Sequence, residues 1–346
     1  MGGQTSQQDY AGIYLERHQA RFITATAETE FNVSSLRNRI PPHRLTAEGQ
    51  ILLDDTCDAS SVLSDLCTTI VEHTPNLRGI GVACYGPYLS LDPEEKVDTN
   101  GRAVYGVLDK KAADPPFAGA DLFNEIKTVL SENGIPDARI SIQTDAMAGA
   151  LAEANFRQLK PNEVLLYITL TDGVGGGFVR GLQPWGSAYH SEMGLTPVHL
   201  TASDRQLYRD HPQRYGPSIG DLVTTKELLR RAQAIGLAPQ TRQELIAIPD
   251  KEIWAAPANY VAQLCVACIG IVAPHCIVIG GPLAANPGFI NEIRGDVKRL
   301  MSTRPGMRWP EQRDVYRFVQ SSLIPKDSSA DSNLAGALYL GMLTAA

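Results

Sequence analysis

The chain has 346 residues, of which 43% are hydrophobic and 20% are charged. This composition is globular, so a disordered or fibrous protein is excluded, and the length predicts two domains, each with a sizeable core. The net charge of −7 and the lack of clustered Lys and Arg argue against nucleic-acid binding, which needs cations to displace counterions from phosphates.

In the first half, strands and helices alternate, as the spacing of apolar residues indicates. Strands are expected at 11–26, 50–54, 78–87 and 140–144. Helices are expected at 60–73, 121–133 and 146–156. This alternation is typical of α/β layers.

The second half repeats the alternation. Strands are expected at 164–171, 177–180 and 276–279, and helices at 224–234, 254–271 and 332–343. We therefore expect two α/β halves with a central cleft, where the carboxyl ends of strands bind ligands.

Neither a membrane span nor an export signal is expected. The longest apolar run, 266–279, is interrupted by Gly270, Pro274 and His275 and is too short to cross a bilayer. The N-terminal residues are polar and lack the apolar core of a signal peptide, which predicts a cytoplasmic protein. Cys265 and Cys268 are spaced like half a metal site, but their apolar helical segment favours buried thiols.

A carboxylate, Asp145, stands where an expected strand ends and an Ala-rich helix begins. Such a residue either caps the helix through its backbone N–H groups or faces the cleft as a general base. On this segment alone the capping interpretation is favoured.

Three further segments are weak signals individually. Glycines at 173, 175, 176 and 177 form a turn that a phosphate can approach closely. His190 and Glu192, two residues apart beside a glycine, are suited to binding hydroxyl groups, although a lone His is more often structural. Gly280 and Gly281 follow a buried strand and can pack against an adenine or simply turn the chain.

Together and in this order, the segments are specific, and they resemble the ROK family of sugar kinases, most closely its bacterial fructokinase branch. The matching segments run in family order from about Ile80 to the C-terminus: Ala83-Cys84-Tyr85-Gly86-Pro87, Tyr105-Gly106, Thr144-Asp145, Leu166-Tyr167-Ile168-Thr169, Gly173-Val174-Gly175-Gly176-Gly177, His190-Ser191-Glu192-Met193-Gly194, Ile279-Gly280-Gly281 and Gly336-Ala337.

The resemblance implies two actin-like domains around an ATP and sugar cleft. We expect them at 1–118 and 119–346, with the last helix packing back toward the first. It implies that Asp145 is the general base, which deprotonates the accepting sugar hydroxyl, and that His190 and Glu192 face the same pocket. It also implies nucleotide binding by a set of glycines, if a nucleotide binds at all: Gly173, Gly175, Gly176, Gly280 and Gly281.

The sequence departs from the family pattern at the phosphate loops. The opening strand–turn–strand of the family carries a glycine pair, and Glu16 stands at or near that place. In the second loop Asp172 replaces a hydroxyl residue. Two like charges about 4 Å apart cost about 1 kcal/mol in water and about 4 kcal/mol at a surface-like dielectric. These acids therefore predict weakened triphosphate binding, with Arg17, His18 or Mg²⁺ offsetting part of the effect.

The residues expected to contact the substrate also differ from the family pattern. Met147 replaces an asparagine, Leu195 replaces a zinc-ligand histidine, and Trp185 adds apolar surface. Together with Thr144, these residues predict a pocket for a flatter or more apolar substrate than a hexose. An apolar pocket would also raise the pKa of Asp145 toward neutrality. His199, Asp210 and His211 lack zinc-like spacing, so neither zinc nor another bound metal is expected.

Three functions follow from these observations. The favoured hypothesis is an enzyme of sugar-kinase fold that needs no cofactor and performs acid–base chemistry (isomerisation, elimination, hydrolysis or cyclisation) on a small metabolite through Asp145, His190 and Glu192. The alternative is an ATP- and Mg²⁺-dependent hexose kinase of fructokinase type. The third is a non-catalytic ligand-binding protein. All three take a small molecule as partner, and the resemblance leaves a homodimer open.

Overall fold

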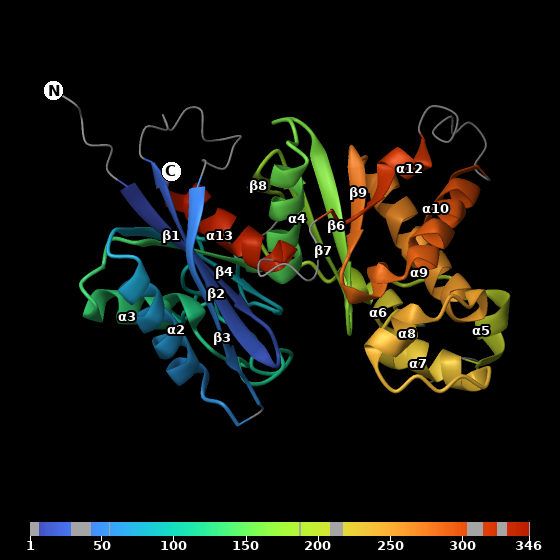
Figure 1. The fold of residues 1–346 in the computed structure, drawn as a ribbon, viewed down its shortest axis with the longest axis horizontal. Helices are drawn as coiled ribbons and strands as arrows, with labels where there is room; N and C mark the ends of the chain where they lie inside the picture. Colours follow the sequence, from blue (N-terminus) through green and yellow to red (C-terminus); the bar gives the residue numbers. More distant parts are fainter. Residues whose placement is uncertain are drawn as a thin grey trace. The chain divides into compact units, whose positions relative to one another are not determined.

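The computed structural model describes residues 7–28, 43–54, 56–186, 188–207, 217–302, 314–323 and 331–345. The chain forms two compact units. Unit 1 comprises residues 1–162, 177–191 and 324–346, and unit 2 comprises 163–176 and 192–323. Figure 1 shows the elements of each unit.

A five-stranded mixed sheet forms the centre of the described part of unit 1, in the order β3-β2-β1-β4-β5. Its strands are β1 (Gln7–Leu15), β2 (Gln19–Glu28), β3 (His43–Leu52), β4 (Leu77–Cys84) and β5 (Arg139–Thr144). The first three strands are antiparallel, whereas β4 pairs in parallel with both β1 and β5. The carboxyl ends of β1, β4 and β5 therefore lie at the same edge of the sheet.

Alternation of side chains gives this sheet two different faces. On β1, Ala11, Ile13 and Leu15 join a large apolar cluster with side chains of two helices. These helices are α2 (Ala59–His73) and α3 (Leu122–Glu132), and their N-terminal N–H groups are capped by Asp58 and Asp121. The expected helices at 60–73 and 121–133 are confirmed within a residue.

The opposite face carries α13 (Ser332–Ala345), which packs against β1, β4 and the helix α4 (Asp145–Phe156) (Figure 1). Backbones meet directly here. A Cβ atom at Gly81 of β4 would overlap the carbonyl of Ala337, and one at Gly336 of α13 would overlap the carbonyl of Ala148 in α4. The last helix of the chain therefore contacts strands close to the N-terminus.

We predict that Gly336→Ala lowers the free energy of unfolding by about 2–3 kcal/mol, because the added methyl group has no space between two backbones. Gly270→Ala is the matched control. Gly270 is also helical, but a Cβ there meets nothing within 4 Å, so alanine should stabilise the helix by up to about 1 kcal/mol. Urea denaturation measures both changes, and equal effects of the two variants would contradict this packing.

A second sheet has the order β10-β9-β6-β7-β8 among the described residues. Its strands are β6 (Val164–Leu170), β7 (Val174–Arg180), β8 (Gln183–Pro184), β9 (Cys276–Gly280) and β10 (Val319–Ser321). β9 pairs in parallel with both β6 and β10. Strand β7 begins three residues before the expected strand at 177–180. It contains Gly175, Gly176 and Gly177, which were expected to form a turn, whereas Gly173 stands in the turn before it.

The helices of unit 2 vary widely in length. They are α5 (Ala202–Leu207), α6 (Ile219–Leu222), α7 (Thr225–Ala234), α8 (Arg242–Ala247), α9 (Lys251–Val272), α10 (Pro287–Ser302) and α12 (Val315–Phe318), with short 3₁₀ turns η1 (Met193–Leu195) and η2 (Pro282–Ala285). By length and composition α9 could cross a membrane, but most of its apolar window is buried inside the protein. Cys265 and Cys268 are buried in it, in agreement with the expected core thiols.

The two units differ from the expected domains 1–118 and 119–346. Residues 119–162 belong with the N-terminal residues because β5 extends the first sheet through its pairing with β4. A boundary at 118 would separate these paired strands. Spacing along the chain predicted the strand but not its partner.

Candidate functional site

Asp145 is the first residue of α4, directly after β5. The N-cap is Thr144, whose hydroxyl oxygen accepts a hydrogen bond from the Met147 N–H at 3.1 Å. The capping interpretation of Asp145 is therefore wrong, because the neighbouring hydroxyl fills that role. Asp145 Oδ1 accepts only a short bond from the Ala146 N–H among the hydrogen bonds of the described residues, at 2.6 Å.

The pKa of Asp145 is raised to about 6. Burial is the main cause, because it disfavours the charged form. The Ala146 N–H and the charge of His190 lower the pKa, whereas the negative charges of Glu16 and Asp331 raise it. A carboxyl group that changes protonation near pH 6 is suited to taking a proton from a substrate at neutral pH.

His190 belongs to the same unit and lies beside the end of β4. Its Nε2 donates to the carbonyl of Tyr85 at 3.2 Å, and its ring lies against Gly86. Gly86 has φ of +68°, and a Cβ atom there would collide with the imidazole. The ring is thus held close to the end of β4, and its charge acts on Asp145.

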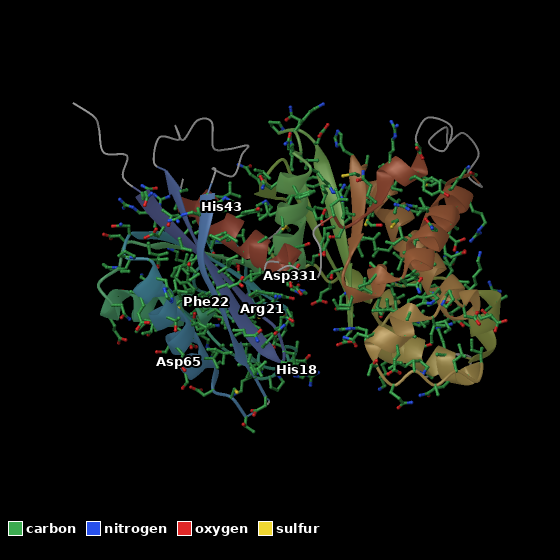
Figure 2. All side chains as sticks on the ribbon, in the orientation of Figure 1. His18, Arg21, Phe22, His43, Asp65 and Asp331 are labelled. Atoms are coloured by element: carbon green, nitrogen blue, oxygen red, sulfur yellow. The ribbon has the colours of Figure 1, made fainter. Side chains whose placement is uncertain are left out.

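Glu16 lies at the end of β1 and is bound by Arg21 of β2. The distance from Arg21 Nη2 to Glu16 Oε1 is 2.8 Å, and the same nitrogen also contacts Asp331, which precedes α13. Arg21 and Asp331 are labelled in Figure 2. The acid expected to repel phosphates is therefore paired with a cation.

Tyr14 completes this group of residues. Its hydroxyl oxygen accepts a hydrogen bond from Asn333 Nδ2 at 2.9 Å, and the Arg21 guanidinium lies 5.1 Å from its ring centroid. Burial, followed by the charge of Asp145, raises the pKa of Tyr14 well above its usual value. Neither Tyr14 and Arg21 nor the role of Asp331 was predicted from the sequence. The one nearby sequence signal was the expected helix at 332–343, which Asp331 directly precedes.

Packing accounts for several glycines of the expected phosphate loops. A Cβ atom at Gly176 would meet the sulfur of Met193, and one at Gly280 would meet the Tyr167 hydroxyl. Gly281 has φ of +83° and lies against the backbone of Leu170. Gly173 alone of these four has open space around its Cα. Gly175 lies in β7, next to Gly176.

Unit 2 contains a mostly apolar cavity of about 330 Å³ beside η2, within the range of small-ligand sites. Side chains of Ile246 and Ala247 from α8 and of Ala285 from η2 line it. Buried Asn286 braces its wall, donating through Nδ2 to the carbonyls of Ile246 and Ile248 at 2.9 Å each.

Asp172 stands at the turn before β7, in the same unit as this cavity. Its side chain is 80% exposed, and Oδ2 lies 4.0 Å from Arg242 Nη1 at the start of α8. Such a charge is screened by solvent and partly offset by the arginine.

Of the predicted substrate residues, Thr144 and Met147 are joined by a hydrogen bond at the start of α4, whereas Trp185 and Leu195 lie on separate segments. Thr144 and Met147 are buried at the start of α4. Trp185 is 43% exposed and packs edge-on to Phe178, with ring centroids 6.0 Å apart. Leu195 is 65% exposed in η1. Glu192, also exposed, directly precedes η1.

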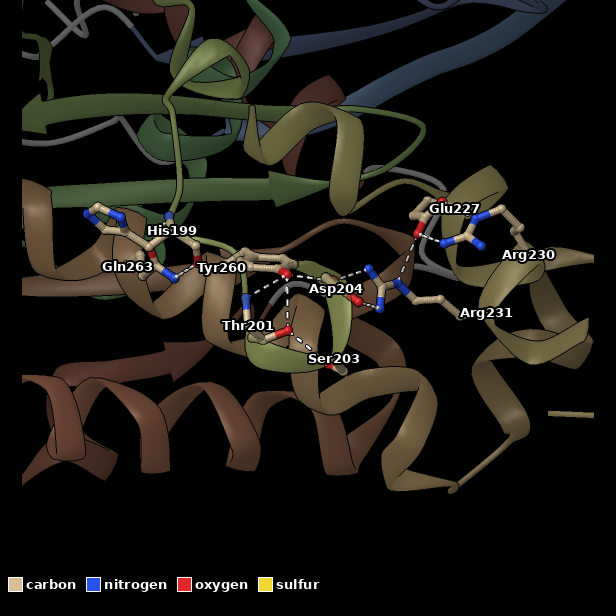
Figure 3. A network of polar contacts seen from close by, with 9 residues as sticks. All are labelled: His199, Thr201, Ser203, Asp204, Glu227, Arg230, Arg231, Tyr260 and Gln263. Carbon is tan, nitrogen blue, oxygen red and sulfur yellow. Dashed lines mark hydrogen bonds and ion pairs between the residues drawn. The ribbon is translucent and has the colours of Figure 1, made fainter. Parts of the chain in front are cut away.

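The segment after Glu192 is held by a network of polar groups, in which Asp204 and Arg231 are buried (Figure 3). Arg231 donates from both terminal nitrogens to Asp204, at 3.0 and 2.6 Å, and the Tyr260 hydroxyl donates to the same carboxylate. The backbone of His199 exchanges two hydrogen bonds with Gln263. These contacts tie the segment to α7 and α9.

No cluster of three metal-binding side chains is present among the residues that the structure describes. Asp210 and His211 lie outside those residues. The expectation of no structural zinc therefore stays a prediction.

Comparisons with known proteins identify the fold and the family. The sequence model of the ROK family matches residues 133–340. The chain belongs to the ROK family. It is 27% identical over 212 residues to the fructokinase of Lactococcus lactis subsp. cremoris, covering 58% of this chain and 67% of that protein.

Two solved structures share the fold of this ROK protein. The ROK hexokinase of Thermus thermophilus has a TM-score of 0.64 and 18% identity, with 96% of this chain and 98% of that chain covered. A ROK family glucokinase of Streptomyces griseus in complex with glucose and AMPPNP has a TM-score of 0.59 and 14% identity, with 96% and 99% covered. The α/β fold of sugar-kinase type is thereby confirmed.

These findings correct the expectation that no cofactor is required. That expectation is wrong, because the chain belongs to a family of sugar kinases and shares its fold with a glucokinase that holds AMPPNP, an ATP analogue. Its physical premise is also weakened at Glu16, since Arg21 pairs with that acid as well as with Asp331. The comparisons favour the kinase alternative over the cofactor-free acid–base enzyme.

We predict that Asp145→Asn stabilises the protein at pH 7.5 by about 1–3 kcal/mol. The folded-state pKa of about 6 exceeds the ordinary 3.8, so between these values the folded state binds more protons than the unfolded state. The stability contributed by protonated Asp145 is therefore lost as the pH rises through this window. The neutral amide avoids that loss.

Thermal or urea denaturation at pH 7.5 and pH 4 measures this effect. At pH 4 the gain should shrink toward zero, because the folded wild type already carries the proton. Exposed Asp137→Asn is the matched control and should show no gain at either pH. A gain of the same size at both pH values would contradict the raised pKa.

Proposed function

We propose that this protein is an ATP-dependent kinase of a small sugar, with Asp145 as the general base. The observation that carries the proposal is the partly buried Asp145 at the start of α4, with a pKa of about 6 and His190 beside it. The carboxylate takes the proton of a sugar hydroxyl as that oxygen attacks the γ-phosphorus of ATP. The bond to the bridging oxygen breaks, and ADP leaves.

The cavity beside η2 supports a place for the nucleotide base. Its apolar lining and volume of about 330 Å³ suit a flat aromatic ring, and Gly281 lets the chain turn tightly beside η2. The exposed carboxylate of Asp172, in the same unit, is a hard oxygen donor of the kind that Mg²⁺ accepts. Magnesium, when bound with ATP, would offset the charge of the phosphates.

The substrate class proposed is a hexose, with fructose as the first candidate, because the L. lactis relative is named fructokinase. The exposed Glu192 and the partly buried His190 are proposed to bind sugar hydroxyl groups. A cytoplasmic location, a homodimer and the absence of nucleic-acid or membrane partners stay predictions.

We expect ADP release that depends on a hexose when the protein is given ATP and Mg²⁺. A coupled assay over a panel that begins with fructose measures it. Asp145→Asn should reduce kcat by at least about 100-fold, because the proton acceptor is lost while the neighbouring contacts remain. The exposed Asp137→Asn variant should retain wild-type activity.

A second variant, Ala285→Phe, tests the base cavity. The added ring should raise the KM for ATP and leave the KM for the sugar unchanged. Hexose-independent ADP release, or equal activity of the wild type and Asp145→Asn, would contradict the proposed function.

A further inference from the structure

Arg21 forms ion pairs near the candidate site, and the proposed reaction assigns no role to it. Its side chain is 15% exposed, and its Nη2 atom bridges two carboxylates that are far apart in sequence. Glu16 Oε1 lies 2.8 Å away, and Asp331 is held by the same nitrogen. A bridge of this kind fixes two negative groups that would otherwise repel each other.

The same guanidinium joins three elements. Arg21 lies on β2, Glu16 follows β1, and Asp331 caps α13 by accepting from the N–H groups of Asn333 and Leu334 at 3.0 and 3.1 Å. Gln19 adds a hydrogen bond to Glu16 at 3.0 Å. The start of the last helix is thereby tied to the hairpin between β1 and β2.

Asp145 lies within the field of this group. Glu16 and Asp331 are the negative charges that act on it, and His190 acts in the opposite direction. Tyr14, Cys84 and Tyr88 also face it, and burial raises the pKa of each so that all three are neutral at pH 7. Arg21 is the cation that directly pairs with both carboxylates.

We propose that Arg21 is a positioning residue for the general base: it holds Glu16 and Asp331 in place and offsets their charges beside Asp145. The inference rests on the proposed function for its catalytic meaning. The effect of Arg21 on the pKa of Asp145 does not depend on the reaction and is measurable without turnover. Without Arg21, two uncompensated anions would remain near Asp145 and favour its protonated form.

The test is the pKa of Asp145, followed by NMR of protein labelled with ¹³C at the aspartate carboxyl carbons and assigned with Asp145→Asn. Arg21→Met should raise this pKa by about one unit or more. Glu16→Gln should lower it, because one of the anions is removed. Arg21→Lys keeps the charge and should leave it near the wild-type value.

The double variant Glu16→Gln/Arg21→Met separates charge from mere structure. It removes one anion and one cation, so the local net charge equals that of the wild type. The pKa should return most of the way to the wild-type value, although both ion pairs are lost. A structural role alone predicts that the double variant is no better than Arg21→Met.

Arg317→Met is the matched control, since Arg317 is 90% exposed and its loss changes the total charge equally. It should leave the titration of Asp145 unchanged. If Arg21→Met does not fold, Glu16→Gln and Arg21→Lys still test the proposal. An Asp145 pKa that Glu16→Gln leaves unchanged overturns it. So does a pKa unmoved in folded Arg21→Met.

Activity provides an independent readout. If the protein phosphorylates a hexose, the acid limb of its kcat/KM profile should move to higher pH in Arg21→Met and to lower pH in Glu16→Gln. If no sugar is phosphorylated, the proposed function fails while the ¹³C titration still tests the role of Arg21. The two failures are thus distinguishable.

Discussion

The close approach of α13 to the first sheet is the constraint on which the candidate site depends. Small residues let the helix backbone touch β4 and α4 directly, so Asp331 at its N-terminus reaches the hairpin between β1 and β2. There it meets Arg21, which also binds Glu16. A bulkier residue in this interface would move the helix and separate the charged groups around Asp145.

Charge balance around each acid, rather than the number of acids, determines how that acid affects a bound phosphate. Glu16 and Asp172 suggest an environment hostile to phosphates when they are considered singly. In the folded chain, Glu16 pairs with Arg21, and Asp172 is mostly in solvent with Arg242 at 4.0 Å. Water and a nearby cation reduce the cost of an exposed acid to a small fraction of its value in a buried site. The sequence departures thus remain compatible with a nucleotide.

Local patterns predicted the elements, and tertiary contacts determined the site. Periodicity placed α2 and α3 within a residue, because each buries one apolar face, and the expected strand at 140–144 lies within a residue of β5. Asp145 was identified by resemblance, since its segment alone favoured a cap that Thr144 provides instead. The contact between Arg21 and Asp331 could not be predicted from local patterns, because the two residues are 310 positions apart and neither is part of a recognisable motif. Glycines of β7 were also misjudged as a turn, because the groups packed against Gly176 and Gly177, the sulfur of Met193 and the backbone of Met147, come from segments distant in sequence.

The most direct test of the account is a ³¹P NMR time course of the wild-type protein with ATP, Mg²⁺ and fructose or another hexose from the panel. The account predicts a new phosphomonoester resonance from the sugar that grows in step with ADP. Intact ATP, or ATP converted only to ADP and inorganic phosphate with every sugar unchanged, would contradict it.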